Sequence, residues 1–358
     1  MENGITIHLG RETAEKQAAL LDRGAAAGIK RLLLTHSRQT CASEDIRTLL
    51  CPLLHQAKAL GVETILDVTP ALLVNLGLPE LLPSAFRMLG IQGLRLSDDF
   101  EIQDVINFSR HQQGLRLFLN ASTMTSSRLR QLLDGHINLS QAEALHSFYP
   151  RTGTGLSEEF LVRKNILIHR TGMRIGAFVT AQPASDEENY ATVTLEEHRQ
   201  EEADVSARHL VALGIDYVFL GGNDPQPKDL EAIGQLRESQ VTMRAQWLTR
   251  NVFLRDLLDN TFTARSDEAR DAIRAKEGQE LLAATQGIVA PDNHTVRPIG
   301  AITIDNLTAG DFMGEIQLIR HPQAADSHVN VAAMVDEAEV NLLQYITPGR
   351  KFSFLFHE

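Results

Sequence analysis

The chain has 358 residues, of which 43% are hydrophobic and 22% charged, and it carries a formal net charge of -12 at pH 7. This length exceeds the roughly 250 residues that one hydrophobic core usually supports, so we expect two domains, and the ordinary composition excludes a disordered chain. The negative charge, without a cluster of Lys and Arg, argues against a protein that binds nucleic acid generally.

Neither the cysteines nor the apolar segments indicate export or a membrane anchor. Cys41 and Cys51 are the two cysteines, too few for a disulfide framework or a zinc quartet. The first residues lack the basic and apolar regions of a signal peptide, and no segment holds 18 uncharged apolar residues in a row. We therefore expect a cytoplasmic protein that does not associate with membranes.

Eight apolar runs of strand length recur along the first part of the chain, separated by helix-like stretches. Each strand and helix pair spans about 30 residues, as parallel βαβ units require. Eight such units predict a (β/α)8 barrel; an open doubly wound sheet is the alternative, which the missing GxGxxG fingerprint disfavours. The predicted strands are residues 5–9, 30–35, 63–69, 93–97, 115–120, 142–148, 174–180 and 216–222.

The pattern changes past residue 240. Residues 266–282 are highly charged, and short apolar runs separated by Gly, Pro and Asp follow at 301–305, 315–319, 329–335 and 351–356. Such runs, without the earlier alternation, indicate a β-rich module. We predict a barrel domain over residues 1–240 and a smaller β-rich domain over 241–358.

Polar residues recur at the C-terminal ends of the predicted strands, where barrels carry their chemistry. The richest of these ends is the segment 141–157, in which an apolar run opens into a loop broken by Pro and Gly. The candidates at the strand ends are His8, Thr35, His36, Asp67, Ser97, Asp98, Asp99, Asn120, His146, Tyr149, Arg151, Thr152, Thr154, Thr180 and the loop 221–224.

The carboxylates among these residues indicate acid-base chemistry. Asp67 lies in the third run, and Asp98 and Asp99 follow the fourth. Glycoside hydrolysis usually requires two carboxyl groups beside one pocket. Asp is also a frequent turn and N-cap residue, so a purely structural cap is the alternative for any one of them.

Other candidates favour a ligand with hydroxyl or anionic groups. Arg151, beside Tyr149, offers a fork of donors suited to carboxylate or phosphate, with a structural ion pair as the alternative. The loop 221–224, which contains Asn223 and precedes Lys228, exposes backbone N–H groups where barrels often bind phosphate, although Gly and Asp also make ordinary turns.

Three histidines raise the question of a metal. His8, His36 and His146 would suit zinc if they converged. The sequence contains neither an HxH nor an HExxH spacing for them, and isolated histidines at strand ends more often form hydrogen bonds. We therefore predict no metal site and no cofactor.

Several longer segments resemble one known family, the bacterial 6-phospho-N-acetylmuramidases, which are glycoside hydrolases. The similarity runs almost from end to end. The segments that carry it are LHSFYPRTGTGLS, VTLEEHR, ARSDEARDAIR, VRPIGAITIDN, GEIQLI, VNVAAMV and LLQYITPG.

The resemblance implies a TIM-like barrel joined to a smaller cyclophilin-like β domain. It also implies an intracellular enzyme that cleaves the β-1,4 bond of a small phosphorylated amino-sugar disaccharide, N-acetylmuramic acid 6-phosphate linked to N-acetylglucosamine, during recycling of cell-wall sugars. The lactyl carboxylate and the phosphate of that substrate would be partners for Arg151 and for the region 221–228. A homo-oligomer is left open.

The similarity is close at Asp67, at Asn120 and over residues 146–155, and it departs at two strand ends. After the fourth run the family pattern has an Asp, one residue and Gly-Phe, whereas this chain has Ser97, Asp98, Asp99 and Phe100; after the second, Gln39 replaces Glu. The departures leave open a catalytically silent or altered-specificity sugar-phosphate-binding protein. A sugar-phosphate isomerase or lyase on the same barrel is a further alternative.

A mechanism follows as a hypothesis. The 2-acetamido carbonyl oxygen attacks the anomeric carbon, while Asp98 and Asp99 divide the roles of orienting the amide and donating a proton. Direct attack by a carboxylate, with Asp67 as the partner, is the alternative. Both versions require these aspartates to share one cavity with Arg151 and Tyr149.

Overall fold

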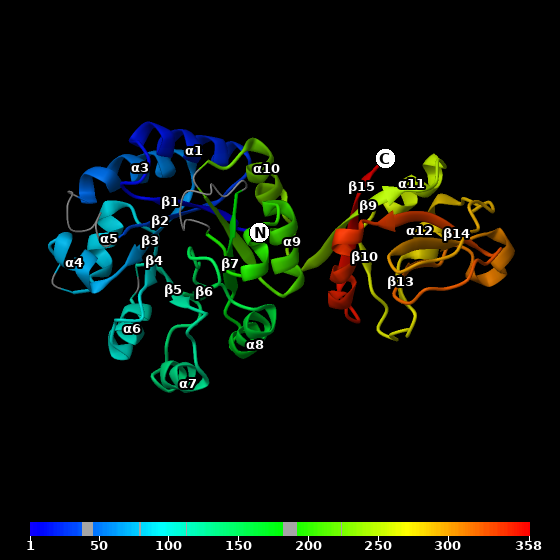
Figure 1. The fold of residues 1–358 in the computed structure, drawn as a ribbon. Helices are drawn as coiled ribbons and strands as arrows, with labels where there is room; N and C mark the ends of the chain where they lie inside the picture. The colour runs from blue at the N-terminus through cyan, green and yellow to red at the C-terminus, as the bar shows by residue number, and fades with distance from the viewer. Residues whose placement is uncertain (38–45, 79, 112, 182–191, 223) are drawn as a thin grey trace. The chain divides into compact units, whose positions relative to one another are not determined.

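The computed structural model describes residues 1–37, 46–78, 80–111, 113–181, 192–222 and 224–358. The chain divides into two compact units, one of residues Met1–Leu210 and Gly214–Glu238 and the other of Val211–Leu213 and Ser239–Glu358. Each unit contains its own sheet (Figure 1).

The sheet of the first unit is a closed barrel of eight parallel strands in chain order, which confirms the predicted (β/α)8 fold. Each predicted run overlaps one strand. The largest difference is in the run 142–148, because β6 ends at Leu145 and the amide of Tyr149 bonds to Val193, outside the barrel strands. The strands are β1 Gly4–His8, β2 Arg31–Thr35, β3 Glu63–Val68, β4 Gly93–Leu96, β5 Arg116–Asn120, β6 Ala142–Leu145, β7 Ile175–Thr180 and β8 Tyr217–Gly221.

Helices surround these strands in Figure 1. Several begin where Ser or Thr accepts a hydrogen bond from the backbone three residues later, which satisfies an N–H group that the helix leaves free. The helices are α1 Ala14–Ala26, α3 Ile46–Leu60, α4 Pro70–Asn75, α5 Pro83–Leu89, α6 Ile102–Ser109, α7 Ser126–Asp134, α8 Glu158–His169, the 3-10 helix η1 Glu196–Arg199, α9 Ala203–Ala212 and α10 Pro227–Gln235.

Large apolar side chains fill the barrel interior. Gly176 makes room for one of them, because a Cβ atom there would lie 2.1 Å from Cε2 of Tyr217. The packed layer provides a floor beneath the C-terminal ends of the strands. Its members are Leu33, Ile65, Phe118, Leu145, Phe178, Tyr217 and Phe219.

A buried layer of charge lies below this floor, at the N-terminal ends of the strands. The guanidinium of Arg31 is fully buried and donates to Glu2, Glu63 and Glu143 at 2.8–2.9 Å. It also lies 4.7 Å from the ring centre of Tyr217, a favourable cation–π contact. Each partner satisfies a charge that would otherwise be costly to bury.

The second unit is built on a seven-stranded sheet in the order β10-β15-β9-β14-β12-β13-β11. The four predicted runs form β12 Ala301–Asp305, β13 Ile316–Ile319, β14 Val329–Val335 and β15 Lys351–His357. The other three strands were not among the predicted runs; they are β9 Gln240–Trp247, β10 Phe262–Thr263 and β11 Ala272–Arg274. The helical elements are α11 Val252–Leu258, α12 Gly278–Thr285, η2 Leu307–Phe312 and η3 Glu337–Tyr345.

Candidate active site

A row of polar side chains lies above the apolar floor, toward the C-terminal ends of the barrel strands. Alternate residues of a strand face the same side of a sheet, so the positions two residues beyond the floor also face inward. The register pairs His8 with Thr35 and Asp67 with Arg95, which places these residues at one level. This upper polar row consists of His8, Thr35, Asp67, Arg95, Asn120, Ser147 and Thr180.

An ion pair between Asp67 and Arg95 occupies the middle of the row. One terminal nitrogen of Arg95 lies 2.9 Å and 3.1 Å from the two oxygens of Asp67, and both side chains are largely buried. The guanidinium also lies 6.0 Å from the ring centre of Phe148 and 5.7 Å from that of Phe178. These contacts fix the carboxylate of Asp67 in position.

A path of hydrogen bonds connects this ion pair to Asp98. Arg95 Nη2 donates to Ser147 Oγ at 3.3 Å, and Ser147 Oγ donates to Asn120 Oδ1 at 3.2 Å. Asn120 Nδ2 in turn donates to Asp98 Oδ2 at 2.8 Å, and Thr123 adds a second bond of the same length to that oxygen. Two carboxylates from different strand ends therefore share one network.

Asp99 points elsewhere, although it is next to Asp98 in the chain. Its Oδ2 accepts a hydrogen bond from Ser97 at 3.1 Å, and it lines a cavity of about 570 Å³ between α4 and α6. Neither aspartate caps α6, whose N-cap residue is Glu101. The structure thus joins Asp67 to Asp98 and leaves Asp99 in a different environment.

His8 and His36 flank the network. His8 Nδ1 lies 2.5 Å from Thr35 Oγ1, and its ring packs edge-on against Phe148. Burial, with the positive charge of Arg11 nearby, lowers the pKa of His8 to about 4, so this imidazole is neutral at pH 7. His36 Nε2 lies 3.2 Å from the backbone oxygen of Asp67.

His146 lies outside the upper polar row. It is fully buried, with Nδ1 3.1 Å from Ser122 Oγ and Nε2 2.9 Å from Oδ1 of Asn165 on α8. Successive side chains along a strand point to opposite faces of the sheet. Because Leu145 faces the barrel interior, His146 faces the surrounding helices. Ser122 Oγ accepts the amide hydrogen of Ser147 at 2.9 Å, and His146 thereby supports the row from outside the barrel.

The loop after β6 carries the other residues predicted to bind substrate. Tyr149 is partly exposed and Arg151 is exposed. Thr154 donates its hydroxyl to the backbone oxygen of Arg151 at 2.5 Å, so its side chain holds the turn together. Among the residues that the structure describes, no hydrogen bond or ion pair engages the Arg151 guanidinium, which remains available to a ligand.

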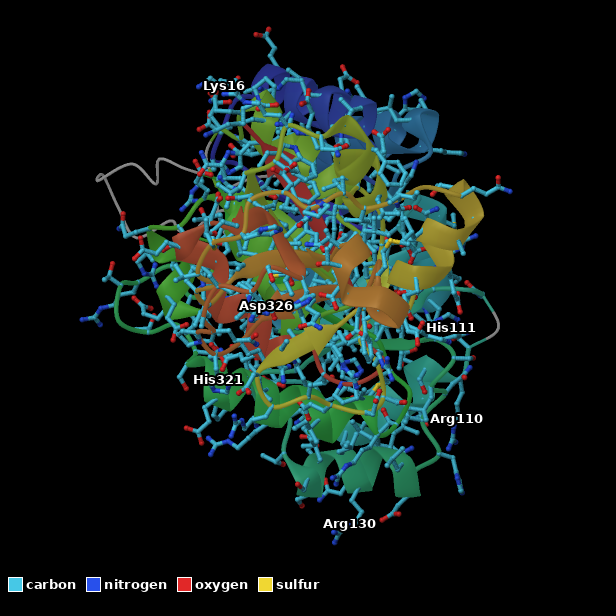
Figure 2. The ribbon with its side chains drawn as sticks, turned by 90° about the vertical axis from the view of Figure 1, so that its right-hand side faces the viewer. Lys16, Arg110, His111, Arg130, His321 and Asp326 are labelled. Carbon is cyan, nitrogen blue, oxygen red and sulfur yellow. The ribbon has the colours of Figure 1, made fainter. Side chains whose placement is uncertain are left out.

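The loop after β8 lines a second cavity, of about 430 Å³, together with β1 and α1. Gly222 and Asp224 contribute from the loop, and Lys16 of α1, labelled in Figure 2, contributes from the helix. Lys228 is not in this lining; it is exposed, and its ammonium lies 3.8 Å from Glu202. Asn223 and Gln39 lie outside the described residues.

Sequence reasoning missed three members of the network, namely Arg95, Thr123 and Ser147. A signal existed for Arg95, because an arginine within an apolar strand must be paired if it is buried. Ser147 and Thr123 carried no such signal, since serine and threonine occur in most loops.

The described parts of the chain contain neither a candidate metal site nor a helix that could span a membrane. No group of three or more His, Cys, Asp or Glu side chains there has an arrangement that could hold a metal ion. No helix in those parts is both long enough and apolar enough to cross a membrane.

The fold and the upper polar row define a TIM-barrel protein with a polar site at the C-terminal ends of its strands. Residues 3–235 match the model of the N-terminal part of 6-phospho-N-acetylmuramidase, and residues 242–355 match the model of its C-terminal part. The chain therefore belongs to the 6-phospho-N-acetylmuramidase family, as the sequence motifs predicted.

Two crystal structures resemble the whole chain. An uncharacterized protein from B. cereus is 26% identical, with a TM-score of 0.82 over 99% of this chain and 100% of that one. A conserved protein of unknown function from Enterococcus faecalis is 24% identical, with a TM-score of 0.67 over 100% of this chain and 97% of that one, and it supports the fold alone. A search among curated proteins found no match.

Proposed function

We propose that this chain hydrolyses the β-1,4 bond between N-acetylmuramic acid 6-phosphate and N-acetylglucosamine, in the cytoplasmic recycling of cell-wall sugars. Membership of the family supports the substrate class. The observation that carries the proposal is the path of hydrogen bonds from Asp67 through Arg95, Ser147 and Asn120 to Asp98. It provides two carboxylates at one site, as glycoside hydrolysis requires.

The contacts of the two aspartates favour different roles. Asp67 is paired with Arg95 as a carboxylate, the form that can orient the acetamido N–H while the acetamido oxygen attacks the anomeric carbon. Asp98 receives hydrogen bonds from neutral groups, and its nearest cation in the described structure, Arg128, is 3.9 Å away. Asp98 then donates a proton to the leaving oxygen of N-acetylglucosamine, and recovers one from the water that completes hydrolysis.

The charges around the site favour one orientation of the disaccharide. The exposed guanidinium of Arg151 suits the carboxylate or the phosphate of the N-acetylmuramic acid 6-phosphate unit. The 570 Å³ cavity beside Asp99 is lined by apolar side chains, by Asn107 and by the acidic residues Glu80, Asp99, Glu101 and Asp104, and its described lining contains no Lys or Arg. That cavity suits the uncharged N-acetylglucosamine unit.

A chromogenic glycoside of N-acetylmuramic acid 6-phosphate tests the proposal. We expect release of the aglycone by the wild type, and a loss of about a hundredfold or more in kcat for Asp67→Asn and for Asp98→Asn, the usual magnitude for acid-base groups. Asp134→Asn, at an exposed position at the end of α7, is the matched control and should retain the wild-type activity. Full activity in both D67N and D98N would remove these residues from the mechanism. Binding without release would favour a silent sugar-phosphate-binding protein, and neither binding nor release would favour an isomerase or lyase.

A further inference from the structure

The loop that carries Tyr149 and Arg151 is held by a carboxylate from a distant part of the chain. Glu196 Oε1 accepts the amide hydrogen of Gly153, and its Oε2 accepts that of Gly155, both at 2.7 Å. These two N–H groups belong to a turn in which Gly153 has a positive φ of 80°. One side chain thus satisfies two backbone donors that the turn leaves without backbone partners.

Arg199, one turn further along η1, holds the carbonyl groups of the same loop. Its guanidinium donates to the backbone oxygens of Tyr149, Pro150 and Arg151 at 3.1–3.2 Å. It also donates to both oxygens of Glu196, at 2.8 Å and 2.7 Å. The side chain of Arg199 is only 8% exposed, so these bonds form largely out of water, where they are stronger.

Backbone pairing supports the same arrangement. The amide of Tyr149 donates to Val193, that of Leu156 donates to Thr194, and that of Glu196 donates to Leu156. Gly155 lies so close to η1 that a Cβ atom there would be 2.7 Å from the backbone nitrogen of Glu196. The loop is therefore joined to the segment 193–199 by backbone and side chain together.

The contacts between the loop and the segment 193–199 do not involve the guanidinium of Arg151. Arg199 takes the backbone oxygen of Arg151, whereas the Arg151 side chain is exposed and has no partner among the described residues. An arginine on a fixed backbone loses less freedom when it binds an anion than one on a loose loop, and it binds more tightly for that reason.

We propose that Glu196 and Arg199 are positioning residues that hold the loop 149–155 in the shape that presents Arg151 to an anionic group of the substrate. This inference rests on the proposed function. It assigns a role to the VTLEEHR segment, to which no contact with the sugar is attributed. Glu196 and Arg199 act through Arg151.

The charge of the Glu196 carboxylate is secured by its partners. Hydrogen bonds from Arg199, and from the amides of Gly153 and Gly155, lower the pKa of Glu196 to about 2. A lowered pKa means that the carboxylate form persists as the pH falls, until the pH approaches that value. Any pH dependence of KM between pH 5 and 8 must therefore come from other groups.

The test separates binding from chemistry with the chromogenic substrate. Glu196→Gln keeps the shape but replaces one acceptor by an NH2 group, which cannot bond to a glycine N–H. Arg199→Lys keeps the charge but loses the fork that reaches three carbonyl groups. Both variants should raise KM by about tenfold with kcat within about twofold, because they weaken a contact that does not change in the transition state, and Arg151→Ala should reproduce the effect.

Two further measurements keep the result interpretable. Glu143→Gln is the matched control, since Glu143 is a buried carboxylate that binds Arg31 and Arg116 at the other end of the barrel; it should lower the melting temperature and leave KM unchanged. Hydrogen exchange of the Gly153 and Gly155 amides should become faster in E196Q and R199K but not in E143Q. This readout needs no turnover, so it remains valid even if the wild type hydrolyses nothing and the proposed function fails.

A second substrate shows whether Arg151 binds the carboxylate or the phosphate. A glycoside of N-acetylglucosamine 6-phosphate lacks the lactyl carboxylate but keeps the phosphate. If the KM effect of E196Q disappears with this compound, Arg151 binds the carboxylate; if it persists, Arg151 binds the phosphate. Faster glycine exchange with an unchanged KM on both substrates would overturn the proposal, and so would unchanged exchange.

Discussion

Replacing His146 with Gln should flatten the dependence of barrel stability on pH. Burial lowers the pKa of His146 from its ordinary value of 6.5 to about 4, although its contact with Asn165 acts in the opposite direction. Between these two values the unfolded chain binds a proton that the folded chain does not, so the folded state loses stability as the pH falls below 6.5. At about 1.4 kcal/mol per pKa unit, the difference between these two pKa values corresponds to a loss of about 3 kcal/mol in the free energy of unfolding.

Hydrogen exchange of peptides from β6 measures this effect directly. The one tryptophan, Trp247, lies in β9, so its fluorescence does not report on the barrel strands. The stability difference between wild type and His146→Gln should narrow by about 3 kcal/mol from pH 7.5 to pH 4. His55→Gln, at an exposed position of α3, is the control for the same substitution outside the barrel interior. A constant difference between wild type and H146Q across this range would refute the reasoning.

One further substitution in each unit tests the role of a buried position. Gly176→Ala introduces a Cβ atom 2.1 Å from the ring of Tyr217. We expect the free energy of unfolding to fall by about 1–3 kcal/mol, and an unchanged melting temperature would show that the side chains of the barrel floor can move to accommodate the added atom. Burial, with the charges of Glu315 and Asp326, raises the pKa of Asp305 from 3.8 to about 7, so the stability of the second unit should fall as the pH rises through this interval. The gain in stability from Asp305→Asn should therefore be about 3 kcal/mol larger at pH 8 than at pH 5 in urea unfolding followed by Trp247 fluorescence, and an equal gain at both pH values would contradict it.

The strands of the barrel were predictable because burial on both faces makes each one a nearly continuous apolar run. The same property hides which residues face inward. His146 and Ser147 are adjacent in the sequence and equally polar in appearance, yet His146 lies against Asn165 of α8 and Ser147 joins the upper polar row. Without a visible alternation, the sequence did not distinguish them.

Charged side chains inside apolar strands indicate which positions of a strand face the barrel interior. Arg31 and Glu143 are buried and bind each other, and Arg95 binds Asp67. Such residues require partners of opposite charge within the barrel, so they mark inward-facing positions. In the second unit, charged residues made a buried strand unpredictable. The strand β11 lies within the charged segment 266–282, which does not have the apolar pattern of a strand, although Ala272 and Ile273 are buried.

The departure of this chain from the family pattern after β4 acquires a physical meaning from the network. The carboxylate of Asp98 reaches Asn120 and Thr123, whereas that of Asp99 reaches Ser97 and the cavity between α4 and α6. A single acidic residue directed toward Asn120 is sufficient to complete the path from Asp67. The replacement of the expected Asp by Ser97 therefore leaves a carboxylate of the candidate site in place, and we expect D98N, not D99N, to lower kcat by about a hundredfold or more.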